Sequence, residues 1–576
     1  MSFLTHLDEN IFENLLNTNE FKAWLISRRW FGDKFLLSNL DFYISLEYFE
    51  IIAERIFLTV IMISRSEEYE KKYFLPLLYY KNLDQVLESS EKDKKNILKL
   101  TENTFSKKIA LTLEKEQKIF TINLIEAEFT LYFWKKMLFE QEITESFPTL
   151  SLKLTLYEEQ FQDEVNMKKV QNLIEASIYP ERYDAKLEQL GKGNTTNLLF
   201  KLTLFNKKEK NTESLSYVMK AYKEYSDSLE PLTLFVLLKN NFPGTPKIYG
   251  TIEIKGKEAI GVYEYLPNQG NVGDIHWNEL NEMIYEVFSN PNEDYSNLIE
   301  KKESSRLIKN YCAETLQVSD RIAESINELH KALIFPENEH YKLEIVESDF
   351  YLSNYTQKLN LMISDLQYLM KQESENMFYN LPKISSILID TKDILEKFRN
   401  EFQKDNIEVQ AVHQDLHMEQ ILYKKEKNSY KFYFMDFEGD PQLSFEEKKQ
   451  KFPIEKDLAS YLRSLSYIKF NTLLQYIEKT IFEEERYVVA EEILYSLFFR
   501  KGTREKRKTL NTVLHFLNKW ESKIMGRFLK DLEPSITLIN YYTIERILHE
   551  IQYEMLFRPN KFIIPLLGLQ EVIENN

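Results

Sequence analysis

Residues 413–440 read HQDLHMEQILYKKEKNSYKFYFMDFEGD, and this stretch decides the fold that we expect for the chain. Asp415 lies near its beginning, and Asp436 and Glu438 lie near its end. Between them, an apolar run, a polar turn and an alternating run from 430 to 434 predict a β-hairpin. The two aspartates are 436 − 415 = 21 positions apart, which fits a strand, a turn and a returning strand. A hairpin would therefore bring both acidic groups to the same end of a sheet.

Two acidic groups in this arrangement suit phosphoryl transfer. One carboxylate accepts the proton of a substrate hydroxyl, and a second holds Mg²⁺ against nucleotide phosphates, helped by a neutral oxygen ligand. Asp415 fits the base, Asp436 the metal ligand and Gln420 the neutral ligand, with Glu438 as a supporting ligand. The alternative is a set of polar loop residues between strands, because a D-x-H triplet alone has low specificity. Further kinase-like parts upstream favour the first interpretation.

A glycine-containing turn lies upstream, between predicted strands at 187–190 and 198–204. It reads GKGNTTN over residues 191–197. Gly191 and Gly193 would let backbone N–H groups approach phosphate oxygens, and Asn194 and Thr195 could add side-chain donors. An ordinary hairpin turn is the alternative, because a G-x-G turn between strands is weakly specific.

The next predicted strand, 216–222, contains one lysine, Lys220. In kinases the third strand supplies a lysine that contacts the α- and β-phosphates and pairs with a helix glutamate. Glu230 opens the following predicted helix and fits that glutamate. The alternatives are an exposed strand lysine and an acid favoured by the dipole at a helix N-terminus. Two further strands are expected at 246–252 and 258–266.

Three of these stretches resemble the maltokinase family. HQDLHMEQ followed by FMDFEGDP is similar to the family's HGDxHxxQ and LDFEGEP motifs, although Gln414 stands where the family has glycine. EYLPNQG at 264–270 is similar to the family's hinge, where the Glu264 carbonyl and the Leu266 amide would face adenine. The opening, RRWFGDK at 28–34, is similar to the start of the family's N-terminal cap domain, and it matches at Arg29, Trp30, Phe31 and Lys34. The resemblance implies ATP and Mg²⁺ as cofactors.

The end of the chain carries a further part of the resemblance. LINYYTIERILHEIQYEMLFRPNKFIIPLLGL at 538–569 is similar to the family's terminal helix. Helical spacing puts Arg546, Glu550, Tyr553 and Glu554 on or near one face, where they could bind sugar hydroxyls and pack on a pyranose ring. A salt-bridged helix face is the alternative. The resemblance adds His413, His417 and Arg463 to the candidate substrate site. Arg463 could bind a substrate or a phosphate, or it could tie the catalytic hairpin to its own helix.

Two departures from the family fall in this terminal helix. Arg546 replaces a lysine of the family, and His549 replaces a tyrosine. Both positions would lie at the sugar subsites. The sequence therefore determines the sugar less closely than it determines the reaction.

Composition narrows the classes of partner. The 576 residues are too many for a single core, and a net charge of −17 argues against a nucleic-acid partner. A single cysteine, Cys312, excludes an internal disulfide and is consistent with a reducing cytoplasm. The N-terminal segment lacks the features of a secretory signal, and no apolar run approaches the ~18 residues of a membrane span.

The expected fold is α+β and bilobal, like that of protein kinases, with an antiparallel β N-lobe and a mainly helical C-lobe. A small β-rich cap domain at 1–125 is expected first, with helices at 10–17 and 19–29 and strands at 40–46, 56–63, 72–78 and 109–113. An intermediate region and the nucleotide-binding N-lobe would follow at 126–265, with helices at 129–138 and 163–178. The catalytic hairpin and the sugar site would lie in a helical C-lobe at 266–576.

The predicted activity is that of an ATP-dependent sugar kinase. The resemblance implies maltose as acceptor, phosphorylated at its anomeric hydroxyl to maltose 1-phosphate for α-glucan synthesis. One alternative is a kinase for another sugar, such as glucosamine. An alternative of another class is a catalytically silent sugar- or nucleotide-binding protein, although such proteins usually lack the base or the metal acid that this chain retains.

Overall fold

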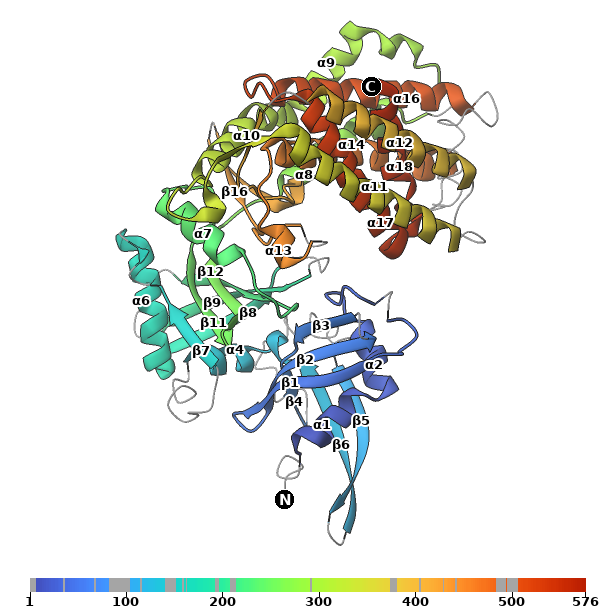
Figure 1. Ribbon diagram of the computed structural model, residues 1–576. Helices are drawn as coiled ribbons and strands as arrows, with labels where there is room; N and C mark the ends of the chain where they lie inside the picture. The colour runs from blue at the N-terminus through green and yellow to red at the C-terminus, as the bar shows by residue number, and fades with distance from the viewer. Residues whose placement is uncertain are drawn as a thin grey trace. The chain divides into compact units, whose positions relative to one another are not determined.

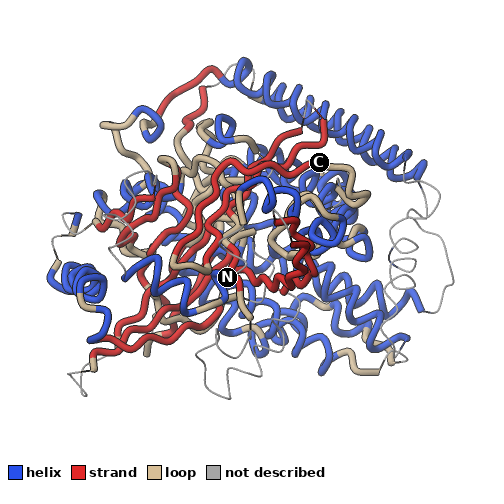
Figure 2. The backbone as a smooth tube through the Cα atoms, turned by 90° about the horizontal axis from the view of Figure 1, so that it is seen from below, coloured by secondary structure: helices blue, strands red, loops and turns tan. Residues whose placement is uncertain are grey.

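The computed structural model describes residues 7–34, 37–66, 69–81, 104–113, 116–139, 152–157, 160–161, 163–191, 196–207, 214–290, 293–372, 381–402, 406–427, 429–440, 443–482, 494 and 506–576. The chain forms two compact units, Met1–Ser228 with Pro246–Leu266 and Leu229–Thr245 with Pro267–Asn576. We call the first the sheet unit and the second the helix unit, because strands dominate one and helices the other (Figures 1 and 2). The expected α+β class is confirmed, with antiparallel sheets in one part and mainly helices in the other.

The sheet unit begins with two short helices and a first antiparallel sheet. Helices α1 (Glu9–Leu16) and α2 (Asn19–Ile26) begin at Asp8 and Thr18, whose side chains accept a backbone N–H of the first turn. The first sheet has the order β1-β2-β4-β6-β5, with β3 paired to β2. Its strands are β1 (Tyr43–Ile52), β2 (Ile56–Ser66), β3 (Tyr69–Phe74), β4 (Leu77–Tyr79), β5 (Thr104–Leu113) and β6 (Glu116–Glu126).

One expected strand of this sheet is wrong. The sequence predicts a single strand at 72–78, whereas the structure has β3 and β4 there, separated at Leu75 and Pro76. Proline has no N–H to donate to a ladder, so a continuous strand is disfavoured at this point.

The second sheet of the sheet unit has the order β7-β11-β12-β10-β9-β8, with every neighbouring pair antiparallel. β10 lies inside it, so that Lys220 is opposite Leu199 of β9 and Gly261 of β12. Its strands are β7 (Leu152–Leu156), β8 (Tyr183–Gln189), β9 (Leu198–Asn206), β10 (Leu215–Ala221), β11 (Ile248–Ile254) and β12 (Lys257–Glu264). Helices α4 (Leu131–Phe139) and α6 (Glu164–Ile178) and the 3₁₀ turns η4 (Ala127–Phe129) and η6 (Pro180–Arg182) complete the unit.

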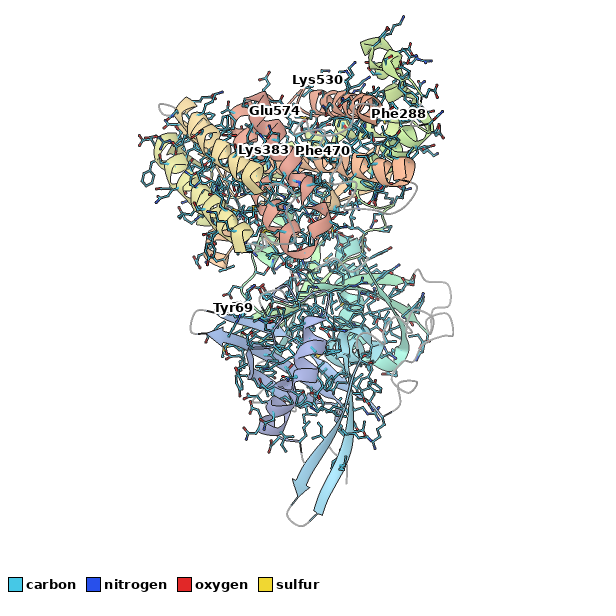
Figure 3. The ribbon with its side chains drawn as sticks, turned by 90° about the vertical axis from the view of Figure 1, so that its right-hand side faces the viewer. Tyr69, Phe288, Lys383, Phe470, Lys530 and Glu574 are labelled. Carbon is cyan, nitrogen blue, oxygen red and sulfur yellow. The ribbon has the colours of Figure 1, made fainter. Side chains whose placement is uncertain are left out.

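The helix unit is built around α14 (Glu455–Tyr476), which is buried along most of its length. It packs against α8, α16, α17 and α18. Apolar rings such as Phe288 and Phe470 are fully buried in this unit (Figure 3). Its longer helices are α7 (Glu230–Lys239), α8 (Val272–Val287), α9 (Lys301–Tyr311), α10 (Ala313–Ala332), α11 (Ser348–Gln372), α12 (Leu381–Glu401), α16 (Lys506–Phe528), α17 (Ile536–Phe557) and α18 (Ile563–Asn575).

Shorter elements of the helix unit carry the predicted catalytic stretch. The expected hairpin is confirmed: β15 (Ile421–Lys425) pairs antiparallel with β16 (Tyr430–Phe434), from Ile421 opposite Phe434 to Lys425 opposite Tyr430. Other short elements are β13 (Glu344–Glu347) paired with β14 (Asn406–Val409), α13 (Phe445–Lys448), the 3₁₀ turns η7 (Ser296–Ile299), η8 (Glu339–Tyr341), η9 (Met418–Gln420) and η11 (Pro559–Lys561), and the π-helical turn at Ile477–Phe482. Among the described residues, no helix has the length and apolarity that a membrane span requires.

Candidate functional site

The hairpin brings the two ends of the catalytic stretch together. The His413 ring donates through Nε2 to the Met435 carbonyl at 2.8 Å, and the Met435 N–H donates to the Gln420 carbonyl at 2.9 Å. The Gln420 side chain lies against Asp436, with its Nε2 3.0 Å from Oδ2. The segments before β15 and after β16 therefore lie side by side.

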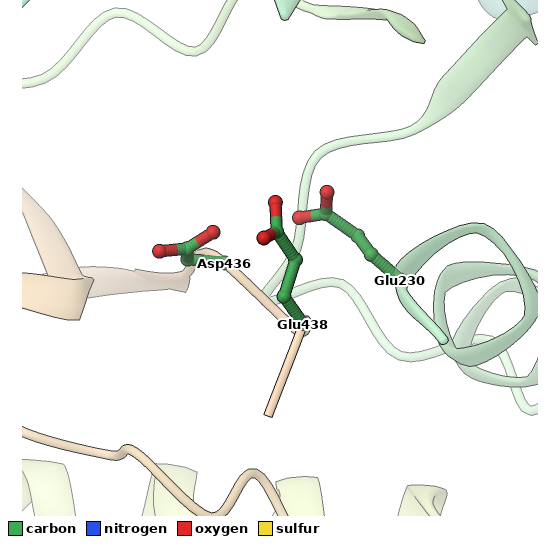
Figure 4. A group of neighbouring side chains, drawn as sticks. All are labelled: Glu230, Asp436 and Glu438. Carbon is green, nitrogen blue, oxygen red and sulfur yellow. The ribbon is translucent and has the colours of Figure 1, made fainter. Parts of the chain in front are cut away.

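Two further acidic residues, Glu230 and Glu438, lie beside Asp436 at this end of the hairpin. One carboxylate oxygen from each of Glu230, Asp436 and Glu438 lies within 4.8 Å of the others, and Figure 4 shows the three side chains pointing toward one another. Glu230 begins α7, is buried, and accepts the backbone N–H of Phe437 at 3.3 Å. Glu230 thus joins the segment that follows the hairpin, although it lies about two hundred residues earlier in the chain.

The three carboxylates fit a hard divalent cation. A cation bound among the three groups would offset the electrostatic repulsion between them. Oxygen donors from carboxylates are the ligands that Mg²⁺ and Ca²⁺ prefer. The amide of Gln420 could add a neutral oxygen, because rotation by half a turn exchanges its nitrogen and oxygen.

Asp415 forms a separate acidic centre, with Arg546 on one side and the ring of His417 on the other. Its Oδ1 is 2.5 Å from Nη1 of Arg546, and its Oδ2 is 3.7 Å from Nε2 of His417. Burial alone would lower the pKa of Arg546, but the Asp415 and Glu550 carboxylates outweigh it and raise that pKa. Arg546 therefore stays charged and fixes the orientation of the Asp415 carboxylate.

The loop before Asp415 is held by a buried aspartate of α14. Asp457 accepts the backbone N–H groups of His413 at 2.9 Å and Gln414 at 2.8 Å, and its Oδ2 lies 3.0 Å from Nε2 of His330. Burial would raise the pKa of Asp457, but the contact with His330 and the neighbouring charge and N–H of His413 outweigh it, so the pKa is lowered. An ionised Asp457 thus fixes the backbone that carries Asp415.

Gln414 adopts the backbone conformation that glycine would favour. Its φ is +69°, in the left-handed region that most side chains avoid. Two contacts offset the strain: its N–H donates to Asp457, and its side-chain Nε2 donates to the Lys448 carbonyl at 2.6 Å. Glutamine at this position is therefore compatible with the loop geometry.

The predicted substrate residues of α17 form a connected ion-pair chain. Arg463 of α14 is buried and donates to Oε2 of Glu550 from Nε at 3.0 Å and from Nη2 at 2.7 Å. Glu550 in turn lies 3.8 Å from Nε of Arg546, which binds Asp415. Gly568 makes room for this chain, because a Cβ there would lie 2.6 Å from the Arg463 guanidinium. Arg463 thus supports Asp415 through two intervening side chains.

The remaining predicted residues of α17 differ in how far their side chains are exposed to solvent. Glu554 is buried and accepts from the Tyr467 hydroxyl and from Nη2 of Arg558, both at 2.7 Å. Burial raises the pKa of Glu554. Tyr553 is 41% exposed and presents its ring at the surface. His549 lies with its Nδ1 2.9 Å from Oδ2 of the buried Asp440, a residue that the sequence did not single out.

The predicted nucleotide residues lie in the sheet unit, apart from Glu230. Gly191 follows β8 with φ +78°, whereas Gly193, Asn194 and Thr195 lie outside the described residues. Lys220 is buried in β10, and its Nζ lies 5.2 Å from the centroid of the Tyr222 ring. Glu264 ends β12 and accepts from Nζ of Lys169 at 2.9 Å, and Leu266 follows two residues later.

Sequence reasoning assigned no role to Asp457 or to Asp440. A single aspartate in an amphipathic helix carries no signal of the loop that it will anchor. Its contacts with His413 and Gln414 span 44 and 43 positions of the chain, respectively. Only the packing of α14 against the loop reveals them.

Comparisons with known proteins give structural neighbours only. No protein-family model matches the sequence, and no curated protein matches it. A glucosamine kinase (crystal form A) is 11% identical, with 92% of this chain and 93% of that chain aligned and a TM-score of 0.49. A glucosamine kinase in complex with glucosamine, ADP and inorganic phosphate is 11% identical, with 72% and 87% aligned and a TM-score of 0.43. An ethanolamine kinase of Plasmodium vivax is 12% identical, with 72% and 89% aligned and a TM-score of 0.29. The resemblance to maltokinases stays a prediction.

Proposed function

We propose that the chain is an ATP-dependent kinase that transfers the γ-phosphoryl group to a hydroxyl of a sugar. One observation carries this proposal: Glu230, Asp436 and Glu438 gather three carboxylate oxygens within 4.8 Å at one end of a hairpin. The loop at the same end of the hairpin carries Asp415, which is bound to Arg546. A cation site and a separate carboxylate base are the two acidic parts that phosphoryl transfer needs.

Asp415 is the proposed catalytic base. It accepts a hydrogen bond from the acceptor hydroxyl and takes its proton as the hydroxyl oxygen bonds to the γ-phosphorus and the bond to the β-phosphate oxygen of ADP breaks. Arg546 holds the carboxylate in place and, by staying protonated, stabilises negative charge on the transferred group. The Asp457 contacts keep the loop from shifting when substrate binds.

Glu230, Asp436 and Glu438, with Gln420, would hold the metal ion. When bound, Mg²⁺ would neutralise charge on the nucleotide phosphates. Lys220 and the turn at 191–195 are proposed to contact the same phosphates, and Glu264 and Leu266 to offer backbone groups to adenine. These assignments are carried over from the sequence pattern, and Lys220 lies in β10 and Glu264 at the end of β12.

The proposed acceptor is maltose, phosphorylated at its anomeric hydroxyl, and Glu550, Tyr553, Glu554, His413 and His417 are the proposed sugar contacts. The exposed ring of Tyr553 supports stacking on a pyranose face. A second sugar such as glucosamine is the competing acceptor. Two residues favour glucosamine as an alternative to maltose. Arg546, which binds Asp415, and His549, which binds Asp440, stand at positions at which this chain departs from the maltokinase pattern.

ATP consumption over a panel of sugars tests this proposal. We expect turnover with one sugar class, and a fall of about a thousandfold or more in kcat for Asp415→Ala. Maltose and glucosamine are the two arms that separate the competing acceptors. Equal turnover by the wild type and Asp415→Ala would remove Asp415 from the mechanism, and absence of turnover on every sugar would overturn the proposal.

A further inference from the structure

A buried ion pair lies between the two sheets of the sheet unit. Nζ of Lys223 is 2.6 Å from Oε1 of Glu128, and both side chains are 0% exposed. Lys223 follows β10 of the second sheet, whereas Glu128 lies in η4 directly after β6 of the first sheet. Burying two charges costs more than most such pairs return, so the pair needs a reason beyond general stability.

The ring of Trp30, from the segment before the first sheet, lies against this pair and is itself held by Glu126 of β6. Nζ of Lys223 lies 4.5 Å from the centroid of the Trp30 ring, a cation–π distance. Nε1 of Trp30 donates to Oε1 of Glu126 at 2.5 Å, and Arg28 lies 3.6 Å from the other oxygen of Glu126. The motif RRWFGDK therefore has a structural use, because its tryptophan forms one wall of the site that holds Lys223.

Backbone hydrogen bonds join β3 of the first sheet to the segment after β10. The Phe74 N–H donates to the Lys223 carbonyl, and the Tyr225 N–H donates to the Lys72 carbonyl, both at 2.8 Å. Asn197, just before β9, accepts the Lys223 N–H through its side chain at 3.0 Å. The chain after β10 is thus fixed on its β3 side and on its β9 side.

Lys223, which these contacts hold in place, lies three residues after Lys220 in the chain. Lys220 is the next-to-last residue of β10, and Lys223 is the second residue after the strand ends. Tyr222, between them, continues the pairing by donating its N–H to the Ala259 carbonyl at 3.0 Å, and its ring lies 5.2 Å from Nζ of Lys220. A shift at Lys223 would therefore move the backbone and the ring against which Lys220 is placed.

We propose that Lys223, Glu128 and Trp30 are positioning residues that let the first sheet set the place of Lys220 for nucleotide phosphates. The inference rests on the proposed function, because it assigns a role in binding the nucleotide. It gives the first sheet a direct part in nucleotide affinity. The competing explanation is a tether that stabilises the unit and leaves Lys220 unaffected.

Calorimetric binding of MgADP to the full-length chain separates these explanations. The main variant is Lys223→Met with Glu128→Gln, which removes both charges together so that neither remains buried alone. We expect its MgADP affinity to fall about tenfold, and Lys220→Met to lower affinity as well. In a protein that already carries Lys220→Met, the paired change should lower MgADP affinity by less than about a further twofold, because the pair acts on affinity only by positioning the ammonium group of Lys220, which this variant lacks. A tether would lower thermal stability and leave affinity within about twofold of the wild type.

A matched control removes an exposed ion pair of the same unit. Lys257→Met with Asp227→Asn deletes a pair at 3.0 Å whose side chains are 38% and 56% exposed, and MgADP affinity should not change. If the main variant does not fold by circular dichroism, Trp30→Phe replaces it, since it keeps both charges and exchanges the indole, with its N–H bond to Glu126, for a smaller ring. Any of three results would overturn the inference. The folded variant could bind MgADP as tightly as the wild type, the paired change could lower affinity as much in the Lys220→Met protein as in the wild type, or Lys220→Met could leave affinity unchanged. A wild type that does not bind MgADP at all would instead overturn the proposed function.

Discussion

At the scale of residues, charge and backbone hydrogen bonds hold the proposed catalytic groups. Asp415 is fixed by Arg546, and its loop is fixed by Asp457. Chemistry singles out Asp415 and Asp436 in the sequence, because phosphoryl transfer needs a carboxylate base and a metal-binding carboxylate, and the predicted hairpin brings these two positions together. The sequence could not place Glu230 beside Asp436, because that contact depends on how α7 packs against the segment after β16.

Substitutions at Gln414 test the strain in this loop. Gln414→Gly relieves a left-handed φ but loses the bond to Lys448, and these effects of about 1 kcal/mol each should nearly cancel. Gln414→Val keeps the strain, adds a β-branch and loses the bond, so we expect a loss of roughly 2–3 kcal/mol in the free energy of unfolding. Urea unfolding of both variants measures the difference, with Gln414→Asn as control because asparagine tolerates this φ. A valine variant as stable as the glycine variant would show that the loop is not strained.

At the scale of elements, the segment 268–271 acts as a third edge to the hairpin. The Gln269 N–H donates to the Tyr423 carbonyl at 3.0 Å, and the Tyr423 N–H donates to the Gly270 carbonyl at 3.0 Å. Oε1 of Gln269 accepts the Lys425 N–H at 2.6 Å. An isolated two-stranded hairpin is marginal in water, so this clamp stabilises the element that carries Gln420 and leads to Asp436.

Gln269→Ala tests the clamp. Loss of the acceptor for the Lys425 N–H should raise the hydrogen-exchange rate of β15 amides by about tenfold, which corresponds to one hydrogen bond. Hydrogen–deuterium exchange over 421–434 measures this, and kcat should fall along with the protection. Gln269→Glu keeps the acceptor and serves as the matched control. Unchanged exchange in the alanine variant would show that backbone pairing alone holds the hairpin.

Apart from β7, the strands of the second sheet and the catalytic hairpin could be predicted because apolar residues and turns alternate there. β6 and β7 could not. β6 begins with Glu116, Gln117 and Lys118, which have weak strand propensity, and β7 is five residues long and pairs with β11, nearly a hundred residues away. Long-range pairing of this kind leaves no local pattern. The split at Pro76 was a local signal that the expected strand at 72–78 overlooked.

At the scale of the whole molecule, chain length predicted more than one folded unit, and the motifs predicted the α+β fold class. Contacts between segments far apart in the sequence could not be predicted in this way. Lys456 illustrates this: it is buried in α14 and lies 2.6 Å from both carboxylate oxygens of Glu545 in α17. A lysine within an amphipathic helix reads as surface in the sequence. The structure instead places it among the rings of Phe452, Tyr355 and Tyr542.

His276 gives the whole molecule a predictable dependence on pH. The side chain is fully buried in α8, and burial lowers its pKa to about 4. The unfolded chain binds a proton near pH 6.5 and the folded chain only near pH 4, so stability falls as pH drops between these values, by up to roughly 3 kcal/mol. The free energy of unfolding of His276→Asn should vary less over this window than that of the wild type, whereas His515→Asn should stay closer to the wild type, because His515 is exposed and the lowering of its pKa is smaller than that of His276. Parallel curves for the wild type and His276→Asn would contradict the assignment.

Manganese(II) binding, followed by electron paramagnetic resonance in the presence of ADP, tests whether the metal site is separate from the base. Asp415→Asn should bind manganese within about threefold of the wild type while phosphoryl transfer falls at least about a hundredfold. Asp436→Asn should lose both manganese binding and phosphoryl transfer. Manganese binding that is unchanged in Asp436→Asn, or lost in Asp415→Asn, would contradict this account.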